Sequence, residues 1–443
     1  MMTAVLALAL WPAAASASPR YSAVVIAVDG LRADHLPFYG YQRQTAPRLS
    51  ARAASAVVFD RAVAQASWTL PSFASLFTSR YAEAHGLNGM HSVLAPGQTL
   101  LAEALRQAGL RTAGFVGGHF LDPVYGLSRG FETYRGDGLA VYRRFPETAA
   151  QAAAWIEAHK DERFFVFVHG NDLHPPFDLG DRGAAETSAF DPEYHGRLDS
   201  MLVDYLFVQV FDGLPFQAIG LTPSQDYLDA VAAVRASPQD VAHLAARYDD
   251  RIAEADAAIE QVFAALEKTG RSRDTIVVLL SDHGFELGEK GKLATAFHAS
   301  QYGAITRVPL VIWHPGLSAR RVAAPVELVD VAPTLLDWLG VAAPKTFQGE
   351  SLAALAAGRR LKAPRPYAFS TSSVVTDVQG RIVMHSVEDG RWKLIYDVAP
   401  PKARLFDLSA DPAETSDVSA THRDVERRLL SALSEHLKEP LPL

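Results

Sequence analysis

The sequence predicts an α/β fold in which helices flank a large, mostly parallel sheet. Short apolar runs alternate along the chain with segments of helical periodicity, the pattern of repeated strand–helix units. Two apolar runs end in reactive polar residues: Val24–Val28 is followed by Asp29-Gly30, and Thr275–Leu280 by Ser281-Asp282-His283-Gly284. Ligands gather beyond the carboxyl ends of strands in such sheets, so these two ends also predict a site.

Each element follows from its local pattern. The predicted strands are short apolar runs: Ala23–Val28, Arg111–Val116, Phe164–His169, Thr275–Leu280 and Pro309–Trp313. The predicted helices are Pro71–Phe77, Thr99–Ala108, Pro146–His159 and Val241–Lys268. The last helix is long, with apolar residues at three- and four-residue steps, and it leads directly into the strand before Asp282.

These elements predict a main domain over residues 20–345. Within it, residues 177–240 lose periodicity and gain aromatic and acidic residues, which we interpret as an insertion or lid. After Gly340 the chain becomes rich in Ala, Pro and Lys, then resumes with strand-like segments at 391–396 and 405–408. A helix is expected from His422 to Leu437. Residues 346–443 are therefore predicted to form a small C-terminal α+β subdomain with antiparallel strands.

Composition limits the classes of function. Of the 443 residues 49% are hydrophobic and 21% charged, as in ordinary globular enzymes. The net charge of −8 argues against general nucleic-acid binding, so an anionic ligand would need local attraction by a metal ion, histidines or arginines. The chain has no cysteine, which excludes disulfides, thiolate metal sites and a cysteine nucleophile. No protein partner can be inferred.

The first residues predict export. Residues 2–11 form a short apolar run, and Ala15-Ser16-Ala17 follows as a small-x-small cleavage pattern. We therefore expect a signal peptide over residues 1–17 and a periplasmic or secreted protein. The apolar run is about half of the roughly 20 residues that span a bilayer, and no later stretch is long and apolar enough. Stable membrane insertion is not expected.

The polar strand ends favour metal binding. A carboxylate and an imidazole side by side suit hard or borderline divalent cations, although Asp29 could instead cap a helix and Asp282-His283 could form a structural turn. Thr69 precedes Pro71 and a helical stretch. A helix N-terminus attracts anions through its backbone N–H groups, but a threonine there is also a common cap.

Together these motifs resemble the sulfatase family within the alkaline phosphatase superfamily. The resemblance is collinear and covers nearly all of the chain after the expected signal peptide. It is carried by the blocks Val28–Tyr41, Thr45–Leu49, Phe59–Ala62, Thr69–Ser72, His85-Gly86, Gly109–Thr112, Gly130-Phe131, His174–Pro176, Ser281–Gly284, Arg307–Leu310, Asp330–Leu336, Leu405–Leu408 and Asp411-Pro412. It implies an alkaline-phosphatase/sulfatase-like fold, with the catalytic domain at residues 20–345.

The resemblance also implies a set of metal ligands. They would be Asp29, Asp282 and His283, with Thr69 as nucleophile and further ligand. Arylsulfatases usually carry a second aspartate where Gly30 stands and often asparagine where His283 stands. The expected cofactor is therefore one divalent ion (Ca, Mn, Mg or Zn), with a second ion as an alternative.

The nucleophile departs from the sulfatase pattern. Sulfatases oxidise the Cys or Ser of a Cys/Ser-x-Pro-x-Arg motif to formylglycine, whereas this chain has Thr69-Leu70-Pro71-Ser72-Phe73. A threonine would give at best a ketone. Thr69 is similar instead to the threonine nucleophile of the superfamily's phosphodiesterases and phosphoglycerol transferases. We therefore predict a metal-dependent hydrolase of small anionic phosphate esters, acting through a covalent phosphothreonine.

Three histidines complete the predicted site. By resemblance, His119 follows a segment in which Gly117 replaces a lysine, His174 contacts substrate, and His298 stands where sulfatases carry a lysine. We assign them to the transferring anion and the leaving-group oxygen, with His174 or His298 as general acid. Alternatively, Asp172, His174 and His298 hold a second metal ion about 4 Å from the first.

Three other functions stay open: a sulfatase acting without formylglycine, a lipid head-group phosphotransferase, and a non-catalytic anion-binding protein. Phosphotransferases of this kind generally begin with several membrane-spanning helices, which this chain lacks. The missing arginine and lysine favour the binding protein, whereas the retained metal ligands favour an enzyme. Among basic residues in the matched blocks, we expect Arg32 to pair with carboxylates, Arg307 to be structural, and Lys393 to be solvated or at a strand edge.

Overall fold

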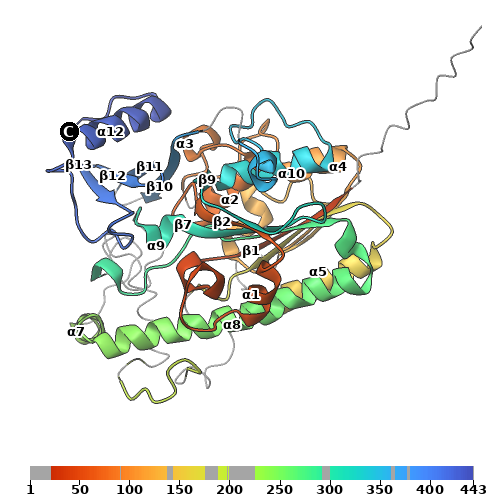
Figure 1. The fold of residues 1–443 in the computed structure, drawn as a ribbon, viewed down its shortest axis with the longest axis horizontal. Coiled ribbons are helices and arrows are strands. Elements are labelled where there is room, and N and C mark those ends of the chain that lie inside the picture. Colours follow the sequence, from red (N-terminus) through yellow and green to blue (C-terminus); the bar gives the residue numbers. More distant parts are fainter. Residues whose placement is uncertain are drawn as a thin grey trace, which may run out of the picture.

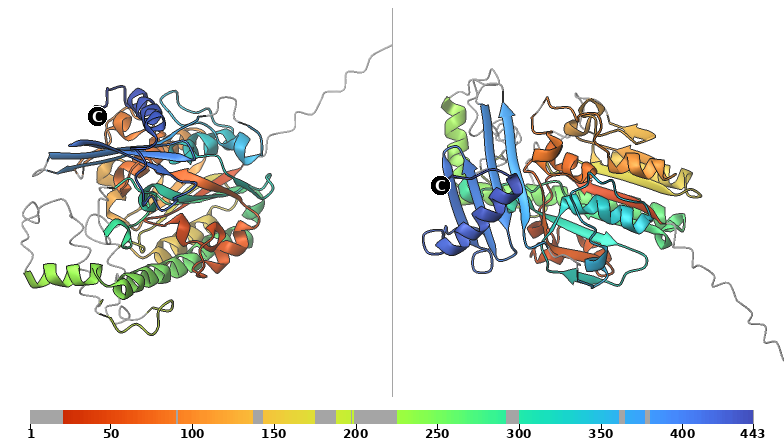
Figure 2. Two further views of the ribbon diagram at one scale, coloured as in Figure 1. Left: turned by 60° about the vertical axis from the view of Figure 1, so that its left-hand side comes forward. Right: turned by 90° about the horizontal axis from the view of Figure 1, so that it is seen from above.

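The computed structural model describes residues 21–89, 91–136, 143–174, 188–196, 198, 225–291, 300–360, 365–376 and 380–442. The predicted signal peptide, most of the predicted insertion and His298 lie outside these residues. The described chain forms a large α/β unit with a small antiparallel sheet beside it (Figures 1 and 2). The predicted fold class is confirmed. In the described ranges no helix combines the length and apolar content needed to cross a bilayer.

The large sheet has nine strands and places β1 near its centre. Its order is β4-β3-β5-β1-β6-β7-β2-β8, and β9 also pairs with β2. The strands are β1 (Ser22–Val28), β2 (Val57–Val63), β3 (Arg111–Phe115), β4 (Thr133–Arg135), β5 (Phe164–Gly170), β6 (Thr275–Leu280), β7 (Arg307–Trp313), β8 (Arg320–Val322) and β9 (Val326–Glu327). Neighbours from β4 to β6 are parallel, whereas β7 is antiparallel to β6 and β2. The carboxyl ends of β5, β1 and β6 therefore meet at one edge.

Helices cover both faces of this sheet (Figure 1). Side chains of β1 alternate between two cores: Ala23, Val25 and Ala27 pack into one, and Val24 and Ile26 into the other. The first core includes α2 (Thr69–Thr78), α4 (Leu101–Gln107) and α10 (Val331–Leu339); the second includes α1 (Pro47–Ala53), α5 (Phe145–Ala158) and α8 (Pro238–Lys268). A strand buried on both faces needs apolar residues throughout, which explains its continuous apolar run.

The predicted helices are confirmed as α2, α4, α5 and α8, with shifted ends. Helix α8 begins three residues before the predicted Val241, because Pro238 occupies its first turn and the Ser237 hydroxyl accepts a hydrogen bond from Asp240 N at 3.2 Å. Helix α7 (Gln225–Arg235) lies within the predicted insertion. Three short α-helices of the described chain are single turns: α3 (Ala82–His85), α9 (Gly303–Thr306) and α11 (Ala353–Ala356).

The small sheet confirms the expected C-terminal α+β element. Strands β10 (Ala368–Thr376), β11 (Gly380–Glu388), β12 (Trp392–Val398) and β13 (Pro401–Asp407) form an antiparallel meander, and α12 (Arg423–Leu437) packs on it. Strands β12 and β13 and helix α12 correspond to the segments predicted at 391–396, 405–408 and 422–437. Strands β10 and β11 were not predicted; in β10, Ser370–Ser373 is a run of Ser and Thr without apolar alternation.

Strand β10 joins the small sheet to the segment that leads into α2. Thr371 N donates to Gln65 O at 2.9 Å. The Ser67 hydroxyl donates to that of Ser372 at 2.7 Å, and Trp68 Nε1 donates to Ser373 O at 3.2 Å. We call these three hydrogen bonds the β10 contacts. They fix the backbone immediately before Thr69.

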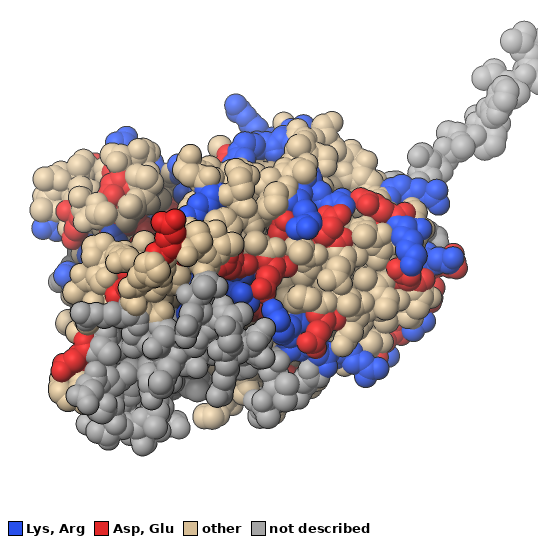
Figure 3. Space-filling model, turned by 90° about the horizontal axis from the view of Figure 1, so that it is seen from below, with Lys and Arg blue, Asp and Glu red and all other residues tan. Residues whose placement is uncertain are grey.

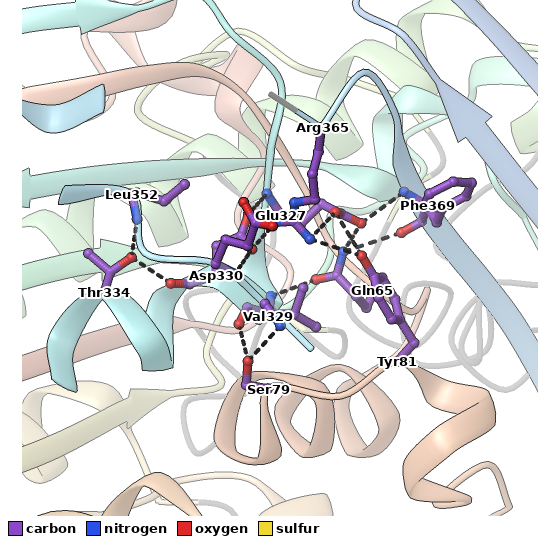
Figure 4. A network of polar contacts seen from close by, with 12 residues as sticks. Gln65, Ser79, Tyr81, Glu327, Val329, Asp330, Thr334, Leu352, Arg365 and Phe369 are labelled. Carbon is purple, nitrogen blue, oxygen red and sulfur yellow. Dashed lines mark hydrogen bonds and ion pairs between the residues drawn. The ribbon is translucent and has the colours of Figure 1, made fainter. Parts of the chain in front are cut away.

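A buried polar network adds to this junction (Figure 4). The Glu327 carboxylate accepts hydrogen bonds from Tyr81 Oη at 2.9 Å, Phe369 N at 2.9 Å and Gln65 Nε2 at 3.2 Å. Arg365 pairs with Glu327 at 3.3 Å. Burial raises the pKa of Glu327 to about 7, although the Arg365 charge opposes this shift. The network ties β9 and α3 to the start of β10.

Lys393 corrects one expectation. It is buried, and its Nζ lies 2.9 Å from Glu414 Oε1 and donates to Thr306 Oγ1 at 2.9 Å. The expectation of a solvated residue was wrong because β12 turns this side chain towards the segment around α9 rather than towards water. Arg32 does pair with carboxylates, as expected, at 2.8 Å from Asp34 and 2.7 Å from Glu289.

We expect Lys393→Met to destabilise the protein by roughly 3–5 kcal/mol, because it leaves the buried Glu414 carboxylate without its cation. Chemical denaturation measures the free energy of unfolding. Lys402→Met, at an exposed position of β13, is the control and should cost less than about 0.5 kcal/mol. The double variant Lys393→Met/Glu414→Gln should recover part of the loss. Equal stability of Lys393→Met and Lys402→Met would contradict the ion pair.

Candidate functional site

Strands β1 and β6 bring the predicted metal ligands together. In their parallel register Ala27 lies opposite Leu280, so Asp29 and Asp282 each follow two residues later. Asp29, Asp282 and His283 are buried, and each offers one ligand atom within 4.8 Å of the other two. His283 Nε2 lies 3.3 Å from Asp29 Oδ1 and 3.4 Å from Asp282 Oδ2. We call these three residues the acidic cluster.

The backbone fixes the orientation of the His283 ring. Nδ1 lies 2.8 Å from Gly284 O, so it carries the proton and donates to that carbonyl. Nε2 then faces the two carboxylates, the arrangement typical of histidines that bind a metal ion through this nitrogen in their neutral form. The Ser281 hydroxyl accepts from Leu31 N at 2.9 Å and donates to His283 O at 2.6 Å, which holds this turn against the end of β1.

The acidic cluster fits a divalent cation. Asp29 Oδ1 and Asp282 Oδ2 are buried and accept no hydrogen bond from any part of the chain that the structure describes. Two bare carboxylate oxygens are costly in a protein interior without a compensating charge. Carboxylate oxygens together with an imidazole nitrogen are donors that Mn, Zn, Mg and, less typically, Ca ions accept.

The pKa values reflect this crowding. Burial, and then the charge of Asp29, raise the pKa of Asp282 to about 6. Burial also acts to raise the pKa of Asp29, but a hydrogen bond from His169 and the His283 charge outweigh it and hold that pKa well below its usual range. Burial acts to lower the pKa of His283, whereas Asp282 and Asp29 raise it above its ordinary value.

Thr69 lies against the acidic cluster. It is the first residue of α2, and its Oγ1 donates to Asp29 Oδ2 at 3.1 Å and lies 3.4 Å from His283 Nε2. The capping residue of α2 is Trp68, so the alternative that Thr69 serves only as the cap does not hold. The Ser72 hydroxyl donates to Asp282 O at 2.6 Å and ties the first turn of α2 to the end of β6.

The structure places the three predicted histidines differently. The His174 ring lies 6.4 Å from the His283 ring, nearly perpendicular to it, at the edge of the acidic cluster. His119 Nε2 lies 3.3 Å from Tyr125 Oη, and its ring packs against Phe120. Within the described residues His119 is not part of the acidic cluster. The role of His298, outside those residues, stays a prediction.

Asp172, one residue of the alternative second metal site, already has partners at the start of α5, and that alternative stays a prediction because His298 lies outside the described residues. Asp172 Oδ2 accepts a hydrogen bond from Phe145 N at 2.6 Å, and its Oδ1 lies 3.6 Å from Arg144 Nε. Asp172 therefore serves the N-terminal end of α5. Among the described residues the acidic cluster is the one group of at least three potential ligands.

Two departures from the family pattern have structural reasons. A Cβ on Gly117 would come within 2.5 Å of the Arg143 carbonyl oxygen, so a lysine would not fit here without backbone movement. Phe73, where the resemblance leads one to expect arginine, is fully buried with its ring 5.3 Å from that of His169.

His169 is a site residue that the predicted set omits. It is fully buried near the end of β5, and its Nε2 lies 3.5 Å from Asp29 Oδ2. The sequence gives one signal, a histidine ending a predicted strand. Chain order does not reveal that β5 pairs with β1, however, so the contact with Asp29 could not be inferred.

The chain is similar in sequence to known sulfatases and related hydrolases. Family profiles match residues 22–341 to Sulfatase and residues 298–440 to N-sulphoglucosamine sulphohydrolase, C-terminal. Arylsulfatase K of Bos taurus is 30% identical over 208 residues, which cover 46% of this chain and 38% of that protein. The multifunctional alkaline phosphatase superfamily protein PehA of Trinickia caryophylli is 32% identical over 225 residues, covering 46% and 42%.

The chain spans about two fifths of the length of these curated relatives. The chain is also similar to a solved structure, the phosphonate monoester hydrolase of Agrobacterium radiobacter. The match covers 95% of each chain, with a TM-score of 0.73 and 21% identity, and shows that the two share a fold. Because the Sulfatase profile matches well over half of the sequence, the chain belongs to the sulfatase family.

Proposed function

We propose that the protein is a metal-dependent hydrolase of small anionic esters of phosphate or phosphonate, with Thr69 as its nucleophile. One observation carries the proposal: Thr69 Oγ1 lies 3.1 Å from Asp29 Oδ2 and 3.4 Å from His283 Nε2, beside two bare carboxylate oxygens. The names of PehA and of the phosphonate monoester hydrolase fit this class of chemistry.

In this proposal Asp29, Asp282 and His283 hold one divalent ion, with Thr69 Oγ1 facing it. Such an ion, when bound, lowers the pKa of the hydroxyl and offsets the charge of the substrate. The acidic cluster would supply the ion's oxygen and nitrogen ligands, and the Nδ1–H···O=C bond to Gly284 would keep His283 in the tautomer that can bind it.

The chain's own residues account for the remaining steps. Asp29 Oδ2 accepts the hydrogen bond of the Thr69 hydroxyl and would take up its proton as Oγ1 attacks. Oγ1 attacks phosphorus, the bond to the ester oxygen breaks, and His174 supplies the proton to that leaving oxygen. The first turn of α2 presents backbone N–H groups to the anion. Water then hydrolyses the phosphothreonine and restores the hydroxyl.

A second candidate, a sulfate ester hydrolase, is favoured by the similarity to arylsulfatase K. We place it second because Thr69 cannot supply the aldehyde hydrate of formylglycine. On the face shown in Figure 3, Lys and Arg are interspersed with Asp and Glu rather than gathered in one basic patch. Export to the periplasm or medium, expected from the sequence of residues 1–17, stays a proposal because these residues lie outside the described chain.

Hydrolysis assays test the proposal. Purified protein is stripped with a chelator and reloaded separately with Mn²⁺, Zn²⁺, Mg²⁺ or Ca²⁺. Each form is then incubated with p-nitrophenyl phosphate, bis-p-nitrophenyl phosphate, p-nitrophenyl phenylphosphonate and p-nitrophenyl sulfate. We expect metal-dependent release of nitrophenolate, faster from the phosphorus esters. Fastest release from the sulfate would select the second candidate, and no release with any ion would contradict both.

A further inference from the structure

We infer that His169 is a positioning residue: its imidazole donates a hydrogen bond from Nε2 to Asp29 Oδ2 and sets the rotation of that carboxylate in the metal site. The inference rests on the metal site of the proposed function and extends it to a residue outside the acidic cluster. It starts from the place of β5 in the sheet. Strand β1 lies between β5 and β6, so Asp29 meets one imidazole from each side.

The two imidazoles face different oxygens of Asp29. His283 Nε2 lies 3.3 Å from Oδ1, whereas His169 Nε2 lies 3.5 Å from Oδ2, near the outer limit of a hydrogen bond. Neither ring nitrogen of His169 has a closer hydrogen-bond partner in the described part of the chain. A fully buried donor without another partner is costly, so Asp29 Oδ2 is the acceptor that satisfies it.

The surroundings of His169 keep its ring in place. Phe73 packs edge-on against it with ring centroids 5.3 Å apart, and the Phe167 ring lies nearly parallel at 6.3 Å. On a third side, a Cβ at Gly118 would come within 2.8 Å of His169 Cε1 and 3.0 Å of Asn171 Oδ1. Gly118 thus leaves just enough space for the imidazole, which cannot swing away from Asp29 without displacing these neighbours.

The position of His169 favours a donor over a direct metal ligand. The bare oxygens Asp29 Oδ1 and Asp282 Oδ2 lie 3.3 and 3.4 Å from His283 Nε2, whereas His169 Nε2 lies 3.5 Å from the other oxygen of Asp29, Oδ2. Asp29 Oδ2 receives Thr69 Oγ1 at 3.1 Å in addition to His169. A donor on Oδ2 therefore turns Oδ1 towards the metal ligands and fixes the oxygen that orients the nucleophile.

Metal titration tests the inference on the full chain. Mn²⁺ binding is measured by calorimetry for wild type, His169→Leu, His169→Gln and the control His159→Leu, whose histidine stacks on Trp155 in α5. We expect His169→Leu to weaken Mn²⁺ binding about 10- to 100-fold, the usual effect of losing a partner of a metal ligand. His169→Gln, which keeps an N–H of similar reach, should restore most of the affinity, and His159→Leu should not change it.

The outcomes separate the two proposals. If wild type binds Mn²⁺ and His169→Leu binds it equally well, the role of His169 is overturned while the metal site stands. If wild type binds none of the ions tested, the metal site fails and the inference fails with it. Thermal unfolding of the metal-free variants reports whether a loss of binding reflects misfolding.

A spectroscopic measurement keeps the inference testable even if His169→Leu does not fold. In ¹⁵N-histidine NMR spectra of the wild-type protein, with His169 assigned from the signals lost in His169→Gln, we expect the proton on Nε2 before and after Zn²⁺ addition. A proton on Nδ1 alone would overturn the donor role, and a large shift of Nε2 on Zn²⁺ binding would instead make His169 a direct ligand.

Discussion

Replacing Thr69 with alanine should lower turnover of the best phosphorus ester by about 10⁴- to 10⁶-fold, the scale of losing a nucleophile whose partners act as a unit with it. The physical reason is that no other hydroxyl is placed within 3.5 Å of both Asp29 Oδ2 and His283 Nε2 in the described chain. Steady-state release of nitrophenolate measures the effect.

Thr69→Ser is the matched control, because it keeps the hydroxyl and removes one methyl group. It should retain activity within about tenfold, and rapid quench with a labelled substrate should trap the phosphoryl group on residue 69 in both active forms. An alanine variant with full turnover, or label on another residue, would contradict the assignment of Thr69.

Replacing Asp282 with asparagine should weaken Mn²⁺ binding by at least about 100-fold, because it removes a charged ligand and one of the two bare oxygens. The same change should raise the thermal midpoint of the metal-free protein at pH 7.5. In that form Asp282 and Asp29 are adjacent buried carboxylates, and a neutral amide relieves their repulsion. Calorimetry and thermal unfolding measure the two effects.

The pH dependence follows from the same carboxylate. Because the pKa of Asp282 is raised from 3.8 to about 6, the folded state holds its proton more tightly than the unfolded state. Metal-free stability should therefore fall as the pH rises from about 4 to 6, by a few kcal/mol at most. The raised pKa of His283 acts in the same direction: its contribution is complete below 6.5 and is lost as the pH rises through the folded value.

Metal binding should show the opposite trend, since the ion requires an ionised Asp282 and a neutral His283. The increase in thermal midpoint on adding Mn²⁺ should be large at pH 7.5 and small at pH 5. Asp282→Asn should show little Mn²⁺ effect at either pH, and its metal-free stability should depend less on pH between 4 and 6. A Mn²⁺ effect that grows as the pH falls would contradict the assigned ligands.

The sequence predicted those parts of the site that lie at the ends of apolar strands. Asp29, Asp282 and His283 follow continuous apolar runs. Such a run predicts a central strand of the sheet from local sequence alone, because only a strand covered on both faces needs apolar residues throughout. Thr69 was assigned through the resemblance of Thr69–Ser72 to the family motif, because the helix start marked by Pro71 suggested a cap equally well. Each of these signals lies within a few residues of the side chain it locates.

What the sequence could not supply was the lateral order of the strands and the direction of single polar side chains. His169 contacts Asp29 only because β5 pairs with β1, a pairing that depends on the whole sheet. Lys393 was assigned to solvent because its partner Glu414 lies in a distant turn. Strand β10 was missed because its Ser and Thr residues form hydrogen bonds to the segment before α2 and do not build the alternating apolar face by which a strand is recognised.

The β10 contacts also bear on the order in which the segment before Thr69 is assembled during synthesis. Ser67 and Ser372 are 305 residues apart, as are Trp68 and Ser373. The core strands β1, β5 and β6 all leave the ribosome before β10, so the sheet can assemble while the turn before Thr69 still lacks its anchor. The hydrogen bonds that hold the backbone before Thr69 can therefore form only after β10 has emerged, when roughly four fifths of the chain has been synthesised.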